Sequence, residues 1–231
     1  QKSLTENRYT PGLSVDWNHD FKLPKLLQQQ WEDYPPSFQK AGEQAAWKYL
    51  RSFCDERGSN YMRQISKPTG SREACSRLSP FIAWGNLSVK QVYQFVKQHP
   101  NTKNHKRAYS AFLTRLKWRS HFMQKFEVEC AYETRCINRG YEQLEWIDNA
   151  NYVEAWKSGQ TGYPMVDANM RCLKATGWIN FRMRAMLTSF ATFTLWLDWK
   201  AVSYHLAQLF LDFEPGIHYP QIHMQAGLTG Y

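Results

Sequence analysis

The chain has 231 residues and a formal net charge of +9, and it is 43% hydrophobic and 16% aromatic. It is long enough to bury one large core or two small ones, and its positive charge favours a partner that carries phosphate groups. Its five cysteines form no C-x-x-C pair, which argues against a disulfide scaffold or a zinc site and indicates a reducing compartment. No apolar run approaches the roughly 18 residues that cross a membrane, so the sequence predicts a cytoplasmic protein without a metal.

The first 40 residues place several prolines between short apolar patches. They predict an irregular lead-in that packs on the domain. Residues 41–231 carry helical periodicity and no convincing alternating strand pattern, so the predicted class is all-α. Within this domain, residues 55–74 are polar and rich in glycine and serine, which predicts a loop.

Most of the remaining segments repeat apolar residues at helical spacing. Ser88 is placed to cap one of these helices, and Pro215 and Pro220 predict a loop after the last of them. The predicted helices cover residues 42–53, 88–96, 106–126, 149–156, 164–176, 178–195 and 202–211.

The run from Thr161 to Trp178 is the most specific signal in the chain. Pro164 suits the first position of a helix, and Gly177 can end that helix in the left-handed conformation. The string TGYPMVDANMRCLKATGW resembles the TGYPxVDAxMRxLxxTGW motif of the photolyase/cryptochrome family. The resemblance extends over residues 42–225. It implies the C-terminal FAD-binding domain of a divergent member, a fragment whose antenna domain and final part lie outside this chain.

The segment Cys75-Ser76-Arg77-Leu78-Ser79-Pro80 resembles the family's TSxLSP motif. Taken alone, small hydroxyl residues at a helix start fit an ordinary cap better than a phosphate site. The resemblance implies that the segment holds the diphosphate of FAD and that an upstream tyrosine contacts the same phosphates. The implied ligands are Tyr61, Cys75, Ser76, Arg77, Leu78 and Ser79.

The segment from Phe112 to Arg119 resembles the family's WxxELxWRE stretch, which passes from flavin to DNA. The resemblance implies that Phe112 packs on the flavin, that Arg119 contacts cofactor and DNA, and that Trp118 stacks on DNA. Arg115 lies on the substrate and DNA side, where it replaces a glutamate that assists dimer repair, and an arginine cannot accept a proton. From the residues alone, an amphipathic core helix remains a good interpretation.

The segment from Gly177 to Arg184 resembles the family's TGWMHNRxR motif, and it implies that Phe181 and Arg182 lie on the substrate and DNA side. A later Asp-Phe-Glu sequence resembles the family's D-G-D, which implies an Arg184–Asp212 pair beside the flavin. His218 falls where photolyases keep an asparagine against the flavin, and a histidine there could donate a hydrogen bond or a proton near neutral pH. The implied cofactor ligands at this end are Arg184, Asp212, Phe213, Glu214 and His218.

Photolyases and cryptochromes also relay electrons to the excited flavin through three tryptophans. Trp146 and Trp199 match the outer and middle members of this relay, but either can equally be a core residue. The flavin-proximal member falls on Ile222, and an aliphatic side chain cannot carry an electron. Trp196 and Tyr219 are the candidates to replace it.

The resemblance implies light-driven, FAD-dependent repair of cyclobutane pyrimidine dimers in DNA by a monomer. A cryptochrome-like blue-light photoreceptor is the alternative, and the substitutions Arg115, Phe181, His218 and Ile222 favour it. A helical nucleic-acid-binding module that has lost flavin is a third possibility. Both flavin-based functions predict a cavity with room for FAD between the Ser76–Ser79 segment and Glu214.

Overall fold

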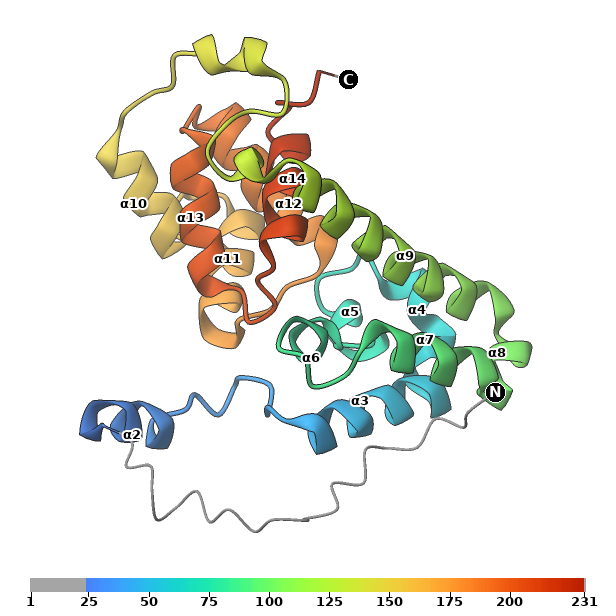
Figure 1. Ribbon diagram of the computed structural model, residues 1–231. Helices are drawn as coiled ribbons and strands as arrows, with labels where there is room; N and C mark the ends of the chain where they lie inside the picture. Colours follow the sequence, from blue (N-terminus) through green and yellow to red (C-terminus); the bar gives the residue numbers. More distant parts are fainter. Residues whose placement is uncertain (1–23, 231) are drawn as a thin grey trace.

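The computed structural model describes residues 24–230, and every regular element in that range is a helix (Figure 1). The all-α prediction is therefore confirmed. Two groups of helices, each with its own core, are joined by one long helix, α9. The elements before and including α9 are α2 (Lys25–Glu32), α3 (Glu43–Asp55), η1 (Arg57–Asn60), α4 (Tyr61–Gln64), α5 (Gly70–Ala74), α6 (Ser79–Ala83), α7 (Val89–Gln98), α8 (Pro100–Asn104) and α9 (Lys106–Val128). After it come η2 (Cys130–Glu133), η3 (Arg139–Gln143), α10 (Ala150–Ser158), α11 (Pro164–Thr176), α12 (Phe181–Ser189), the π-helical η4 (Phe190–Thr194), α13 (Trp199–Leu209) and α14 (Pro215–Gln225).

The first lobe consists of α3 to α8, and its core lies against α9. Leu50 and Phe53, on the apolar face of α3, are fully buried there. The predicted cap at Ser88 is confirmed, because its Oγ accepts the Gln91 N–H at 3.1 Å while the Gln91 side chain accepts the Ser88 N–H at 2.9 Å. This reciprocal cap fixes where α7 begins.

The second lobe consists of α10 to α14 and encloses a separate core around Trp156, Trp199 and Leu187. The Thr161–Trp178 motif begins in the turn between α10 and α11 of this lobe. The Asp167 carboxylate accepts the N–H groups of Thr161 and Gly162 at 2.8 and 3.0 Å, which folds the turn back onto the first turn of α11.

The predicted loop at Pro215 and Pro220 is wrong, because these residues lie in α14. Pro215 occupies the first turn, where no N–H is needed, and the helix continues through Pro220. Gly216 allows close contact with α9, since a Cβ there would lie 2.7 Å from the Met123 sulfur. Helix α14 therefore packs directly on the helix that joins the lobes (Figure 1).

Three other boundaries differ from the sequence prediction. The predicted loop over residues 55–74 contains η1, α4 and α5, because Tyr61 in this polar stretch is buried in the first core. The predicted helix 178–195 begins only at Phe181, where Asn180 caps it by accepting the Met183 N–H at 3.0 Å, and it ends in a π-turn. The last predicted helix runs from Trp199 to Leu209.

Part of the lead-in is helical rather than irregular, since α2 covers Lys25–Glu32. Further along, the Ser37 hydroxyl donates to the Ala175 carbonyl, and the Gln39 amide donates to the Arg77 carbonyl at 2.7 Å. These bonds tie the end of the lead-in to both lobes. Residues 1–23 lie outside the described residues, so their packing on the domain stays a prediction.

Gly177 tests the packing at the end of α11. Its φ is +65°, and a Cβ would lie 2.4 Å from Leu211 Cγ. We expect Gly177→Ala to lower the free energy of unfolding by about 3 kcal/mol through steric overlap and left-handed strain together. Gly162→Ala is the control: its φ is +84° with nothing within 4 Å, so it should lose only about 1 kcal/mol. Equal losses in urea unfolding would contradict the clash.

Candidate functional site

The Ser76–Ser79 segment, called the anion turn below, has an unusual backbone. Arg77 adopts a left-handed φ of +60°, and Leu78 follows in the right-handed region at φ −89° and ψ −10°. Successive left- and right-handed residues point consecutive N–H groups into one concavity that binds anions. The short helix α6 begins at the next residue, where the Ser79 N–H has no partner within the helix.

The side chain of Arg77 supplies a buried positive charge beside this turn. It is 9% exposed, its Nε has no hydrogen-bond partner, and its guanidinium lies 4.1 Å from the ring centre of Trp178. Burial, reinforced by neighbouring Arg72, lowers the pKa of Arg77 to about 10. A buried cation without a full set of partners is costly, and an anion in the turn would offset that cost; phosphate binding here stays a prediction.

At the other end of the site, an ion pair joins α12 to the segment before α14. Arg184 Nη2 donates to both carboxylate oxygens of Asp212 at 2.9 and 2.7 Å, and its Nε donates to the Ile179 carbonyl. The guanidinium also lies 4.0 Å from the centre of the Phe210 ring. The Asp212 side chain is only 4% exposed, and Arg184 is its ion-pair partner in the interior.

A second ion pair links α9 to the start of α14. Arg119 binds both carboxylate oxygens of Glu214 through its Nε and Nη2. Burial raises the pKa of Glu214 above its usual range, although Arg119 opposes the shift. Arg184, Asp212, Glu214 and His218 line a crevice of about 20 Å³, roughly room for one water molecule. The predicted open cavity is therefore nearly closed at this end.

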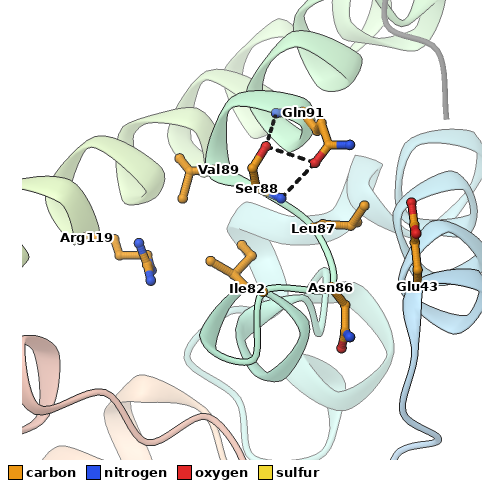
Figure 2. A pocket seen from close by; sticks show the side chains of 9 residues that line it. Glu43, Ile82, Asn86, Leu87, Ser88, Val89, Gln91 and Arg119 are labelled. Atoms are coloured by element: carbon orange, nitrogen blue, oxygen red, sulfur yellow. Dashed lines mark hydrogen bonds between the residues drawn. The ribbon is translucent and has the colours of Figure 1, made fainter. Parts of the chain in front are cut away.

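A larger pocket of about 480 Å³ lies between the α6–α7 connection, α3 and α9 (Figure 2). Ile82, Val89 and Glu43 form parts of its wall, and Arg119 is the predicted site residue that reaches it. The Arg119 side chain thus lies between this pocket and Glu214.

Comparison with known proteins identifies the family. A sequence family described as the FAD binding domain of DNA photolyase matches residues 112–231, more than half of the chain. The chain belongs to the photolyase FAD-binding domain family. Deoxyribodipyrimidine photo-lyase of Alkalihalophilus pseudofirmus is 33% identical over 174 residues, which cover 75% of this chain and 35% of that protein. The chain therefore spans about a third of the length of this curated relative.

Solved structures agree with this assignment. A bacterial class III photolyase from Agrobacterium tumefaciens has a TM-score of 0.77 at 25% identity and covers 93% of this chain and 41% of its own. A Synechocystis cryptochrome has a TM-score of 0.76 at 26% identity, and the match covers 82% of this chain and 40% of the cryptochrome chain. The predicted resemblance is confirmed, and FAD is the cofactor of this domain family.

The chemistry of the photolyase domain residues fits FAD at both ends. The anion turn and Arg77 can receive a diphosphate, while Arg184, Asp212 and Glu214 present charged groups to the polar edge of a flavin ring. The crevice must widen to admit the flavin ring. One of its wall residues, Glu214, is held by the ion pair with Arg119. The cofactor roles of these residues stay predictions.

The structure narrows the two roles predicted for His218 to the hydrogen bond. Burial lowers its pKa to about 4, so the ring is neutral near neutral pH and cannot donate a proton from an imidazolium. Its Nε2 lies 2.9 Å from the Ser203 carbonyl, which can only accept, so Nε2 carries the hydrogen. Nδ1 is then an acceptor, and His218 can offer only a lone pair at that atom.

Several predicted ligands lie in the first core. The ring centre of Phe112 lies 4.8 Å from that of Phe53 and 6.0 Å from that of Tyr61. The Tyr61 hydroxyl interacts with the Arg115 side chain. Cys75 is buried, which raises its thiol pKa to about 11 and keeps it protonated. Flavin contact by Phe112, phosphate contact by Tyr61 and substrate contact by Arg115 stay predictions.

The rest of the anion turn is rigidly held. Ser76 Oγ accepts the Leu78 N–H at 3.4 Å, and Ser79 Oγ accepts the Trp178 indole N–H at 3.2 Å. The Leu78 side chain is buried in the first core, so this residue offers its backbone alone.

The two rings predicted to stack on DNA are exposed. Trp118 is 49% exposed on α9, and Phe181 is 44% exposed at the first position of α12. Arg182, also exposed, lies 5.8 Å from the Phe181 ring centre. Both rings are free to meet a partner.

The predicted relay tryptophans occupy different settings. The Trp199 ring is buried and lies 4.3 Å from His223, whereas Trp146 packs 5.3 Å from Trp196. Ile222 lines the crevice, as the resemblance implies for the flavin-proximal position. Tyr219 stays a candidate replacement, because it contacts Phe213 and His218 at 6.2 and 5.3 Å.

Sequence reasoning missed Arg57 and Gln39, whose bonds reach the anion turn, and Phe210, which lies under Arg184. Nothing in the local sequence marks these residues, because each acts through a contact made by folding.

Among residues 24–230, no three His, Cys, Asp or Glu side chains gather as a metal site. None of the helices in the described part of the chain combines the length and apolarity of a membrane span.

Proposed function

We propose that this photolyase-family domain binds FAD and uses blue light to repair cyclobutane pyrimidine dimers in DNA. The observation that carries the proposal is the position of the two exposed rings. Phe181 lies three residues before Arg184 on one helix face, and Trp118 directly precedes Arg119. Phe181 therefore shares a helix face with Arg184, while Trp118 is the sequence neighbour of Arg119 on α9, and the carboxylate partners of both arginines line the crevice.

Each group of residues has a role in this proposal. The anion turn and Arg77 hold the diphosphate, and the Arg184–Asp212 pair orients the flavin. FAD supplies light absorption and electron chemistry when it is bound. Trp118 and Phe181 stack on bases turned out of the helix, because stacking needs exposed flat faces. Arg182 and the net charge of +9 attract the phosphates.

The test is illumination of the reduced, FAD-loaded protein with oligonucleotides that carry defined cyclobutane dimers. We expect the dimers to disappear in light and to persist in the dark. Phe181→Ala should weaken binding of these oligonucleotides about 5- to 150-fold, which corresponds to the loss of one stacked base. Phe193→Ala is the control, because Phe193 is also exposed but contacts Gly227 at the far end of the chain. Intact dimers despite bound FAD would refute repair.

A blue-light photoreceptor is the second candidate. It is supported by Ile222 in the crevice and by Arg115, which interacts with Tyr61 and cannot accept a proton from a lesion. In that case, illumination of FAD-loaded protein should leave dimers intact and change the protein's protease cleavage pattern. A colourless protein that binds DNA would instead support a module that has lost flavin.

A further inference from the structure

Arg57 connects α3 to the segment that leads into the anion turn. Its Nη1 donates to the carbonyls of Glu73 at 2.7 Å and Cys75 at 2.5 Å. Its Nη2 donates to the carbonyls of Tyr49 at 3.0 Å and Ser76 at 3.4 Å. A planar guanidinium fork can serve several acceptors at once, whereas an ammonium group is a single point charge. One side chain therefore ties α3 to consecutive peptides before the turn.

These bonds set the direction of the N–H groups in the turn. A trans peptide is planar, so the carbonyl of one residue and the N–H of the next point in opposite directions, and the described chain has no cis peptide. Because Arg57 attracts the carbonyls of Cys75 and Ser76, the N–H groups of Ser76 and Arg77 point away from it. They are thereby presented on the side opposite the guanidinium.

Gln39 acts on the next peptide. Its Nε2 donates to the Arg77 carbonyl at 2.7 Å, which directs the Leu78 N–H away from the lead-in, on the side where it meets Ser76 Oγ. The Gln39 side chain is buried, and its Oε1 has no partner. Burial of an amide with an unpaired oxygen is unfavourable. The hydrogen bond to the Arg77 carbonyl is the favourable contact of the Gln39 side chain that offsets this cost.

The turn requires such support because Arg77 is a non-glycine residue with φ +60°. Strained backbone of this kind persists only where surrounding contacts determine it, and it gathers at functional sites. Arg57 and Gln39 hold the peptides on both sides of Arg77, one from α3 and one from the lead-in.

We propose that Arg57, assisted by Gln39, is a positioning residue that keeps the anion turn in the shape that receives the diphosphate of FAD. This inference rests on the proposed FAD site. Loss of Arg57 should let the peptides rotate and scatter the N–H groups, while the flavin-ring end of the site stays unchanged.

The test compares FAD, ADP and riboflavin as ligands of the apoprotein, measured by calorimetry and flavin fluorescence. Arg57→Gln should weaken FAD and ADP about tenfold or more and leave riboflavin, which has no phosphate, within twofold. Arg57→Lys should recover only part of the loss. Gln39→Leu should weaken FAD and ADP less than Arg57→Gln. The control is Arg63→Gln, which removes an exposed positive charge from neighbouring α4 and should change nothing.

A second background separates positioning from general structural support. Glycine adopts positive φ freely, so Arg77→Gly removes the strain that Arg57 opposes. It also removes a guanidinium assigned to the diphosphate, so each Arg57→Gln loss is taken as a ratio to the affinity of its own background. Within that background, Arg57→Gln should weaken ADP less than threefold, whereas a purely structural role would cost the same factor in both backgrounds. Equal losses, or unchanged FAD affinity in Arg57→Gln, overturn the inference. If the parent chain binds neither FAD nor ADP, the proposed site itself is wrong and the inference falls with it.

Discussion

Arg184→Ala should yield protein without flavin. The substitution removes the partner of a carboxylate whose side chain is 4% exposed, and breaking a buried ion pair from one side typically costs about 3–5 kcal/mol. The Asp212 charge would then repel the electron-rich edge of a flavin instead of orienting it. We expect FAD affinity to fall at least 100-fold, measured by visible absorbance of the purified protein and by titration of the apoprotein.

Two companion variants show whether the effect belongs to the ion pair. Arg182→Ala removes an exposed arginine two positions away and should keep its flavin. The double variant Arg184→Gln, Asp212→Asn removes both charges together, so it should unfold less readily than Arg184→Ala yet still lack flavin. A yellow, FAD-saturated Arg184→Ala protein would show that Asp212 and Arg184 do not bind the cofactor.

Local sequence signals predicted the fold where one residue decides the outcome. The cap at Ser88 and the left-handed stop at Gly177 depend on neighbours within a few positions, and both are present as expected. Proline signals were less informative. Pro215 marks a helix start as readily as a turn. The structure has a helix there, and its packing on α9 at Gly216 is a tertiary contact that the local sequence does not indicate.

For the site, motif resemblance identified the Arg184–Asp212 pair, whose partners are 28 positions apart. It did not reveal the state of His218, because the pKa of an imidazole depends on burial and on the Ser203 carbonyl rather than on nearby sequence. Nor could it show the closed crevice. The crevice is lined by residues of α12, α13 and α14 with the segment before α14, and its wall residue Glu214 meets Arg119 only through the packing of α14 on α9.

His223 should make the domain lose stability as the pH falls from 6.5 toward 4. The ring is fully buried, and burial lowers its pKa from 6.5 to about 4. Its Nε2 lies 2.9 Å from the Tyr132 carbonyl and its Nδ1 accepts the Ile137 N–H at 3.1 Å. Only the neutral tautomer satisfies both contacts, because a proton on Nδ1 would face another N–H.

The sign of the effect follows from linkage. Between pH 6.5 and 4 the unfolded chain binds a proton at this histidine that the folded chain does not, so stability falls as the pH falls. The loss approaches about 1.4 kcal/mol per pH unit and reaches about 3 kcal/mol in total. His218 and His205, whose pKa values burial lowers in the same direction, add two further protons. Urea unfolding from pH 7 to 4 measures the combined slope.

His223→Gln isolates the contribution of this residue. A glutamine amide can donate to the Tyr132 carbonyl and accept from Ile137 without titrating, so the variant should lose about a third of the pH dependence that the three buried histidines contribute while remaining folded at pH 7. His105→Gln is the control, because His105 is exposed at the start of α9 and should leave the slope unchanged. An unaltered slope in His223→Gln would mean that the acid sensitivity arises elsewhere, with His218 the next group to substitute.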